Sequence, residues 1–406
     1  MKILSLSLVY PNPDEPGLGI FVRSRLQAIA ETAEVKVIAP IPVVDYSNPK
    51  GKLLRSRTFP LSRWDGPIEV FHPRWVFPPN GTPLNVLCLA GRLLPLLRRI
   101  WRDFAFDLID AHFGYPEGAA AALLAGASDV PFTITLRGSE TMFAGYRYRS
   151  DAMRWAFRRA GRVITVSEDL RQFAITQGVA EERTATIPNG IDRETFFPRD
   201  RQAARVKHGL MPDRKVIVSA GELIEAKGHH VAAEALRALL DEGMDAELLI
   251  VGATARGGSR FEETLRQTVA QLGLTERVRL IGFVDRASMA ELLSAADVFC
   301  LASYTEGCPN VVNEALACGA PVVATHVGGV PSMVTSERYG FMMPPRDVPA
   351  LRDALREALC RPWDRSAISD WGRSRSWQQV AREVIDVMQS ILSSKAHAVK
   401  LSYVRN

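Results

Sequence analysis

The segment from Asp297 to Val327 constrains the fold of this chain more than any other part of its sequence. It begins and ends with apolar runs rich in β-forming residues, and helix signals lie between them. Pro309 suits the first turn of that helix, and Gly319 suits the position just past its last turn. The segment therefore predicts a strand, a loop, a helix and a second strand.

Two glutamates of this segment lie near the predicted helix N-terminus. Glu306 is in the loop before the helix, and Glu314 is in its early turns. A helix N-terminus offers unpaired N–H groups and partial positive charge, which attract phosphate. Carboxylates beside a phosphate need other partners, and sugar hydroxyls are such partners. The arrangement predicts a nucleotide-sugar site; the alternative is a solvated pair of glutamates in an ordinary α/β domain.

The residues around both glutamates resemble a known signature. Glu306 and Glu314 have seven residues between them, Gly307 and Pro309 follow the first, and EALACGAPVVAT begins at the second. This pattern resembles the E-x7-E signature of retaining family 4 glycosyltransferases. The resemblance implies an α/β fold with two Rossmann-like parallel-sheet domains facing across a cleft, the glycosyltransferase B fold. It also implies donor-site roles for the residues between the glutamates: Gly307, Cys308, Pro309, Asn310 and Val311.

Composition and charge agree with that assignment and argue against other classes. The chain has 406 residues, enough for two cores, and no apolar stretch long enough to span a membrane. Its N-terminal apolar run breaks at Pro11 and suits a buried strand better than a secretion signal. Five scattered cysteines without C-x-x-C indicate a reducing cytosol and no metal cluster, and the net charge of +5 gives little support for nucleic-acid binding. We expect a cytoplasmic protein with no cofactor and no metal.

The first half alternates strand and helix patterns, which predicts a parallel sheet covered on both faces. Strands are expected at 2–9, 35–39, 108–111 and 132–136, with a helix over 21–32. Gly17 and Gly19 follow the first strand and would let backbone approach a ligand. The position resembles the family's glycine loop, which favours Gly19 as a donor-site residue.

Two stretches of the first half are basic or irregular. Residues 40–80 show no sustained period and are interpreted as an insertion lying over the sheet. The run 92–102 is apolar on one side and basic on the other, and six arginines lie between 147 and 162. The run predicts either a core-facing helix with a solvated basic edge or a helix resting on anionic lipid. The arginines fit the lipid surface or phosphate groups on an acceptor.

Two motifs after strands of the first half resemble acceptor-side loops of the family. His112 follows a strand, where ligands of open α/β sheets bind, and a substrate contact is weighed against a packed bystander. Arg137 stands where the family commonly has histidine, and Glu140 where it has aspartate. Arginine cannot act as a base at neutral pH, so Arg137 is expected to act electrostatically.

The second half matches the family more densely, beginning with a turn signal at Pro188-Asn189-Gly190. In the loop after the next strand, Gly221 and Lys227 match a motif that binds the donor diphosphate, but Glu222 replaces its arginine. We expect Arg137 to supply part of the missing charge. Phe283 lies near where the family reads the nucleotide base, and Ser332 replaces a glutamate of a further motif.

The resemblance implies a domain plan and a reaction. Residues 1–190 would bind the acceptor, 200–365 the donor, a helix at about 370–392 would cross back to the first domain, and 393–406 would be a mobile tail. Glu306, Lys227, His112 and Arg137 are the expected catalytic residues. The expected reaction is retaining transfer of a hexosyl group from a UDP- or GDP-sugar to a glycan or lipid-linked acceptor. A non-catalytic nucleotide-sugar-binding homologue and a sugar-nucleotide epimerase are the alternatives.

Overall fold

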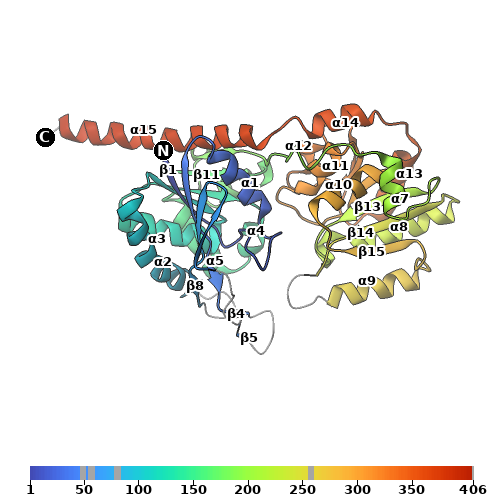
Figure 1. Cartoon of the computed structure of the whole chain (residues 1–406), viewed down its shortest axis with the longest axis horizontal. Coiled ribbons are helices and arrows are strands. Elements are labelled where there is room, and N and C mark those ends of the chain that lie inside the picture. Colours follow the sequence, from blue (N-terminus) through green and yellow to red (C-terminus); the bar gives the residue numbers. More distant parts are fainter. Residues whose placement is uncertain (46–51, 54–59, 77–83, 255–259, 405–406) are drawn as a thin grey trace. The chain divides into compact units, whose positions relative to one another are not determined.

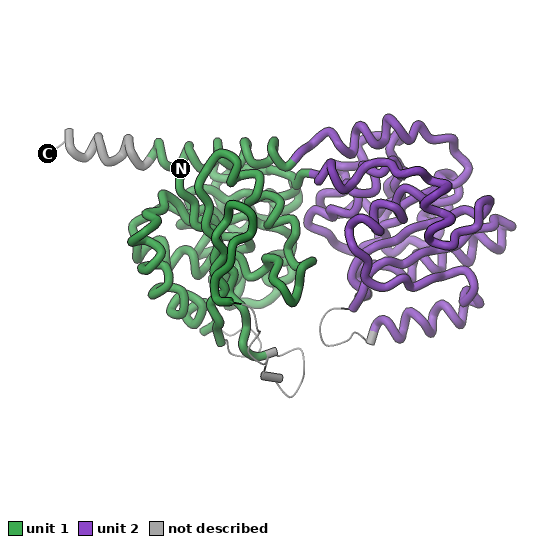
Figure 2. The backbone as a smooth tube through the Cα atoms, viewed as in Figure 1, with its two compact units in different colours: residues 1–190, 377–406 green, residues 191–376 purple. Residues whose placement is uncertain are grey.

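The computed structural model describes residues 1–45, 52–53, 60–76, 84–254 and 260–404. The chain divides into two compact units, which Figure 2 shows in different colours. Unit 1 comprises residues 1–190 and 377–406, and unit 2 comprises residues 191–376. Each unit has its own largely parallel sheet with helices packed against it (Figure 1).

The sheet of unit 1 has the strand order β12-β11-β10-β9-β1-β2-β7-β6, and every neighbouring pair except β6–β7 is parallel. Its strands are β1 (Lys2–Leu6), β2 (Glu34–Ile38), β6 (Ser62–Asp65), β7 (Ile68–Phe71), β9 (Leu108–His112), β10 (Phe132–Leu136), β11 (Arg162–Thr165) and β12 (Thr184–Thr186). The helical segments are α1 (Ile20–Ile29), α2 (Leu84–Asp103), η2 (Gly114–Gly118), α3 (Ala119–Ser128), α4 (Ser139–Phe143), α5 (Arg147–Phe157), α6 (Glu168–Thr176) and η3 (Glu181–Arg183). Two short ribbons pair β3 (Ile41–Pro42) with β8 (Arg74–Trp75) and β4 (Val44–Asp45) with β5 (Lys52–Leu53).

Part of the expected insertion belongs to the sheet itself. β7 pairs with β2, and β6 closes the edge as an antiparallel hairpin partner. The interpretation of 40–80 as an insertion over the sheet is therefore wrong for 62–71. The side chains of Ile68 and Val70 are fully buried, so β7 has the alternating burial of a strand. The alternation covers only these few residues and was not recognised among the prolines and arginines around it. Residues 46–51, 54–59 and 77–83 lie outside the described residues.

The sheet of unit 2 has the order β15-β14-β13-β16-β17-β18, and all of its pairs are parallel. The strands are β13 (Lys215–Ala220), β14 (Ala246–Val251), β15 (Val278–Gly282), β16 (Val298–Leu301), β17 (Val322–Thr325) and β18 (Gly340–Met343). The helical segments are α7 (Arg201–Lys207), η4 (Glu225–Lys227), α8 (His229–Asp241), α9 (Arg260–Gln271), α10 (Arg286–Ala295), α11 (Asn310–Ala317), α12 (Val330–Met333), α13 (Val348–Cys360) and α14 (Arg365–Gly372). The chain winds outward from β13 to β15 and then restarts at β16 on the other side of β13. The point between β13 and β16 is where ligands of doubly wound sheets bind, at the carboxyl ends of the strands.

The strand–loop–helix–strand segment is confirmed as β16, α11 and β17. Pro309 lies one position earlier than expected, because it is the N-cap of α11 rather than a residue of its first turn. Gly319 follows the helix with φ +75°, and a Cβ there would lie 2.8 Å from the carbonyl oxygen of Arg365. A side chain at this position would therefore be strained and would clash.

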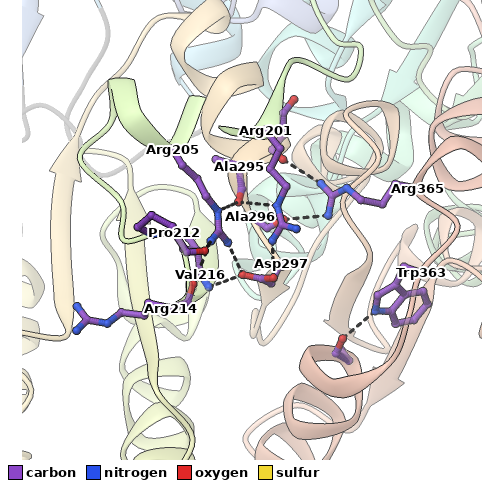
Figure 3. A network of polar contacts seen from close by, with 12 residues as sticks. Arg201, Arg205, Pro212, Arg214, Val216, Ala295, Ala296, Asp297, Trp363 and Arg365 are labelled. Carbon is purple, nitrogen blue, oxygen red and sulfur yellow. Dashed lines mark hydrogen bonds and ion pairs between the residues drawn. The ribbon is translucent and has the colours of Figure 1, made fainter. Parts of the chain in front are cut away.

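Charged side chains fix the opposite, amino end of β16 (Figure 3). Asp297 accepts hydrogen bonds from Arg201, from Arg205 at 2.6 Å and from the backbone of Val216 at 2.7 Å. Arg365 donates to the carbonyls of Ala296 and Ser294, both at 3.0 Å. These contacts join α7 to the start of β16 and α14 to the end of α10.

The last helix, α15 (Trp377–Val404), belongs to unit 1 and packs against α1. Val380, Val384 and Met388 of α15 are buried in the same core as Leu26 and Ile29. The returning helix begins at Trp377 because residues 365–372 form α14 in unit 2. It continues to Val404 through most of the expected tail, and residues 405–406 lie outside the described part of the chain. None of the helices in the described part is both long and apolar enough to cross a membrane.

Candidate active site

Lys227 and Glu306 meet at the switch point of unit 2. Lys227 ends η4 in the loop after β13, and Glu306 lies in the loop after the neighbouring strand β16. The Lys227 ammonium donates to Oε1 of Glu306 at 2.6 Å, and the Ser303 hydroxyl donates to the same oxygen at 2.7 Å. The Glu306 side chain is 8% exposed and that of Lys227 is 25% exposed, so a ligand in the loops can reach the ammonium more readily than the carboxylate.

Glycines bring the loops of this site into backbone contact. Gly228 has φ +66°, and a Cβ there would lie 2.0 Å from the carbonyl oxygen of Ala302. Gly328 has φ +54°, and its Cβ would lie 2.1 Å from the carbonyl oxygen of Glu306. Side chains at either position would push the loops apart. The loops after β13, β16 and β17 therefore form one close-packed edge.

Glu314 lies on α11 and is half-buried. In the described part of the chain its carboxylate makes no hydrogen bond and no ion pair. Burial raises the pKa of Glu314 to about 7, the nearby charge of Arg286 lowers it, and that of Asp192 raises it. Arg286 itself donates to Asp192 at 2.8 Å. A half-buried carboxylate without a donor is suited to receive hydroxyl groups from a ligand.

The other predicted donor-site residues lie in the same carboxyl-end loops. Phe283 directly follows β15 and is 73% exposed, which is unusual for phenylalanine and suits a stacking surface. Glu222 follows β13, and its side chain is exposed and has no partner within the described ranges. Gly221, Gly307, Cys308, Pro309, Asn310 and Val311 lie in the loop after β13 or between Glu306 and the first turn of α11. The structure thus brings together every predicted donor-site residue except Gly19, which belongs to unit 1.

Gly19 follows β1 and is the N-cap of α1. It has φ +67°, and a Cβ there would lie 2.3 Å from the carbonyl oxygen of Val9. Glycine is therefore required for the path of this loop. The loop leaves the carboxyl end of β1, which lies beside β9 at the switch point of unit 1.

His112 and Arg137 are in contact inside unit 1. Arg137 donates to Nδ1 of His112 through Nε at 3.2 Å and Nη2 at 3.0 Å, and through Nη1 to Asn189 at 3.3 Å. Because guanidinium only donates, the neutral ring carries its proton on Nε2, which lies 3.2 Å from Oδ2 of Asp110. The ring is fully buried, and burial lowers the pKa of His112 to about 4. Neither nitrogen faces solvent, so the structure places His112 beneath the surface at which a substrate contact was expected.

A buried ion pair supports this histidine. Arg25 of α1 donates to both carboxylate oxygens of Asp110, at 3.0 and 3.2 Å, and to the Thr135 hydroxyl at 2.8 Å. Burial would raise the pKa of Asp110, but Arg25 and His112 hold it well below its ordinary value. Arg25 was missed in the sequence, because its partner lies 85 residues away and no local pattern marks a buried arginine.

Two buried carboxyl groups lie at the same edge of unit 1. Glu140 accepts from the backbone N–H groups of Gly114, Arg137 and Gly138, at 3.0, 3.2 and 2.8 Å, which ties the loops after β9 and β10 together. Glu117 accepts from the backbone of Leu8 at 3.0 Å, and burial raises its pKa to about 8. Glu117 does not stand out in the sequence. The sequence marks this residue only as a glutamate that follows closely after the strand ending at His112 and after Gly114.

In the described ranges, His, Cys, Asp and Glu side chains do not gather in groups of three or more that could hold a metal ion.

A doubly wound sheet with a lysine–glutamate pair beside a helix N-terminus, both at the switch point, is typical of nucleotide-binding α/β enzymes. Two family models match the chain: Glycosyltransferase Family 4 over residues 17–195 and Glycosyl transferases group 1 over residues 200–375. The chain belongs to the family 4 glycosyltransferases, and each of its units corresponds to one half of the glycosyltransferase B fold.

Comparisons with individual proteins agree with this family. A putative teichuronic acid biosynthesis glycosyltransferase, TuaC of Bacillus subtilis, is 29% identical over 375 residues, which cover 87% of this chain and 88% of that protein. A putative colanic acid biosynthesis glycosyltransferase, WcaL of Escherichia coli, is 32% identical over 267 residues, which cover 62% of this chain and 61% of that protein. Anabaena HepE in complex with UDP has a TM-score of 0.71 at 21% identity, covering 96% of this chain and 100% of HepE. A structure of HepE with UDP-glucose has a TM-score of 0.66 at 22% identity, covering 98% and 100%.

Proposed function

We propose that this glycosyltransferase moves a hexosyl group, with retention of anomeric configuration, from a UDP-sugar to a glycan or lipid-linked acceptor of surface polysaccharide or glycolipid synthesis. The observation that carries the proposal is the arrangement in unit 2, where the Lys227–Glu306 pair and Glu314, whose carboxylate has no partner among the described residues, flank the N-terminus of α11. UDP is favoured over GDP because HepE has been solved with UDP and with UDP-glucose. The acceptor class follows the names of the teichuronic acid and colanic acid relatives.

The donor would be held along the carboxyl edge of unit 2. Glu314 would accept hydrogen bonds from the ribose, and Phe283 would lie beside the base. The N–H groups that begin α11 and the Lys227 ammonium would bind the diphosphate. Glu306 would hold hydroxyls of the transferred sugar. The Lys227 ammonium, which donates to Glu306 in this structure, would then donate to both Glu306 and the phosphate oxygens.

The reaction would break the bond between the anomeric carbon and the diphosphate oxygen. Negative charge would develop on the diphosphate, where Lys227 and α11 would stabilise it, and positive charge on the sugar ring, where Glu306 would. The acceptor oxygen would bond to the anomeric carbon on the face that the diphosphate leaves. Its proton would pass to a diphosphate oxygen, so no protein base is required. His112, neutral and enclosed, fits this scheme better as part of the scaffold around Arg137 than as a base.

No divalent cation is part of this proposal, because lysine and helix N–H groups can supply the positive charge that the leaving group needs. Turnover of UDP-sugar should therefore be unchanged in EDTA. A loss of turnover that Mg²⁺ or Mn²⁺ restores would contradict metal independence.

We also propose a peripheral contact of unit 1 with anionic membrane. The core-facing side of α2 is confirmed, since Leu89, Leu93 and Leu97 are buried. Its outer side nevertheless exposes apolar residues beside arginines, a combination that suits a lipid surface. The exposed residues are Leu84, Leu87, Trp101, Arg92, Arg98, Arg99 and Arg102 on α2, and Arg147 and Arg154 on α5.

Vesicle sedimentation tests this contact. The protein should bind vesicles with anionic phosphatidylglycerol more than neutral phosphatidylcholine vesicles. Charge reversal of Arg98 and Arg99 should reduce binding, and reversal of Arg382, exposed on α15, should not. Equal binding of both lipids, or an equal effect of the control, would contradict the proposal.

The first test of the main proposal is thermal shift with UDP-, GDP- and ADP-sugars on wild type and Glu314→Ala. Stabilisation by UDP-sugars that weakens in the variant would support the donor site. Turnover then separates a transferase from a binding homologue, and release of an epimer without acceptor would reveal an epimerase. Stabilisation by none of the sugars would contradict the proposed donor site.

A further inference from the structure

A tyrosine and a histidine join the two loops that carry Lys227 and Glu306. Oη of Tyr304 lies 2.8 Å from Nε2 of His230. Tyr304 lies in the loop after β16, two residues before Glu306, and His230 lies in the first turn of α8, three residues after Lys227. This hydrogen bond therefore links the two loops close to both of the groups expected to meet the donor.

The main chains of the same loops also touch. The backbone N–H of Tyr304 donates to the carbonyl of Ala226 at 2.8 Å. On the other side of Lys227, Gly228 approaches Ala302 so closely that no side chain fits. The side-chain bond thus adds a third link. Apart from the Lys227–Glu306 pair itself, it is the link that a substitution can remove without altering the backbone.

The ring of Tyr304 is held in one orientation. The guanidinium carbon of Arg346 lies 4.2 Å from its ring centroid, and the His230 ring meets it edge-on at 6.0 Å and 85°. Arg346 follows β18 with φ +63°, a left-handed conformation that costs an arginine about 1 kcal/mol or more. The His230 ring also lies edge-to-face with Phe261, with 5.4 Å between the ring centroids. Arg346 thus packs on the face of the Tyr304 ring, and Phe261 packs against the histidine that the Tyr304 hydroxyl meets.

These residues lie outside the set expected to touch the donor. Glu314, which would bind the ribose, is on α11, whereas Tyr304 and His230 support only the two loops with Lys227 and Glu306. A change in the link should therefore move the lysine and the glutamate relative to one another and leave the nucleoside site intact.

We propose that Tyr304 and His230 are positioning residues that set the placement of Lys227 and Glu306 for sugar transfer. The inference rests on the proposed function. Lys227 would stabilise the leaving diphosphate and Glu306 the sugar, so both must be placed to within a fraction of an ångström, and a displacement of about 1 Å can lower a rate about 100-fold. Loss of the link lowers kcat much more than it weakens nucleotide affinity, because Lys227 is only one of several groups that would hold the nucleotide.

The test begins with Tyr304→Phe, which removes the hydroxyl and keeps the ring against Arg346. The kcat for UDP release from a UDP-sugar should fall about tenfold, while the Kd for UDP, measured by calorimetry, should rise by about threefold at most, because the N–H groups of α11 and Glu314 still bind the nucleotide. Tyr339→Phe is the matched control, since Tyr339 is half-buried at the amino end of β18 and stacks on Trp371. Its kcat should remain at the wild-type level.

The histidine supplies a rescue experiment. His230→Gln places an amide near the position of Nε2 and should retain most of kcat, whereas His230→Leu should lose as much as Tyr304→Phe. The double variant Tyr304→Phe/His230→Leu should be no slower than either single variant, because both remove one link. Multiplied losses, an unimpaired Tyr304→Phe, or a glutamine variant as slow as the leucine variant would overturn the proposal.

A crystal structure of Tyr304→Phe separates this inference from the proposed function. The loops should move, so that the 2.6 Å contact between Lys227 and Glu306 lengthens or is lost. An unchanged contact would overturn the positioning role even if wild type turns over UDP-sugars. If wild type turns over no nucleotide-sugar, the proposed function fails, and the same structure still decides whether the link positions the pair.

Discussion

The Lys227 ammonium lies 2.6 Å from Oε1 of Glu306, and the two residues reach this contact from neighbouring parallel strands. The ion pair balances the negative charge of the largely buried Glu306 carboxylate before any donor binds. It also holds the ammonium at the N-terminal side of α11, where a diphosphate would gain from both groups.

Replacing Lys227 with methionine should lower kcat about 100- to 1000-fold, because the leaving diphosphate loses the side-chain cation that unit 2 would supply. The measurement is the rate of UDP release at saturating UDP-sugar. Lys215→Met is the control and should keep wild-type turnover, because Lys215 lies at the amino end of β13, the strand that precedes the Lys227 loop. Turnover within a few fold of wild type in Lys227→Met would show that the ammonium does not meet the leaving group.

Replacing Glu314 with glutamine should stabilise the empty protein and weaken nucleotide binding. The Glu314 carboxyl loses its proton near pH 4.5 in the unfolded chain, whereas burial raises its pKa to about 7 in the folded protein. The carboxyl therefore destabilises the folded state more and more as the pH rises from 4.5 to 7, and by a constant amount above pH 7. The free energy of unfolding of the variant should therefore exceed that of wild type by at most about 3 kcal/mol at pH 8, and should equal it at pH 4. Thermal unfolding at both pH values measures this.

UDP affinity gives a second reading of the same carboxyl. Wild type should bind UDP more tightly at pH 8 than at pH 6, because the ionised carboxylate accepts ribose hydrogen bonds more strongly. Glu314→Gln should bind about tenfold more weakly at pH 8 and show a smaller dependence, the part that comes from ionisation of the terminal phosphate of UDP. An equal pH dependence in wild type and variant would mean that the ribose does not meet this residue.

Gly328→Ala should damage the donor site through the backbone of Glu306. The added Cβ would lie 2.1 Å from the Glu306 carbonyl oxygen, so the loop must move. Gly273→Ala is the matched control, because Gly273 has φ +67° but no other atom lies within 4 Å of the place that an added methyl group would take. The control should lose only about 1 kcal/mol of stability from strain, and Gly328→Ala should also lose more than tenfold in turnover. Equal turnover of the two variants would contradict a role for this close approach.

His112→Gln should make unfolding less sensitive to acid. In the unfolded chain His112 binds a proton as the pH falls below 6.5, whereas in the folded protein the ring binds it only near pH 4. The free energy of unfolding of wild type should therefore fall by about 3 kcal/mol across this range. The drop in Tm from pH 7.5 to pH 5 should be smaller in the variant. His326→Gln, at an exposed histidine, should keep the wild-type drop. An activity limb near pH 6.5 that disappears in His112→Gln would instead show that the ring titrates in the working enzyme.

Local patterns predicted the elements that carry the site and much of its membership. β16, α11 and β17 were predictable because apolar runs, Pro309 and Gly319 mark their ends within one short segment. Contacts between distant segments were not. The burial of His112 depends on Arg25 and Arg137, and the edge position of β6 and β7 depends on their pairing with β2. The Tyr304–His230 bond joins residues 74 positions apart, and neither residue has a neighbour in sequence that marks it.

The return of α15 to unit 1 has a consequence for the synthesis of the protein. Unit 2 is one continuous segment and can complete its core as soon as Ser376 has left the ribosome. Unit 1, although its first strand is made before unit 2, lacks Val380, Val384 and Met388 until the segment that follows unit 2 has been made. The half of the molecule that is begun before the other is therefore completed after it, and a truncation just after Ser376 would expose the core of unit 1 while sparing unit 2.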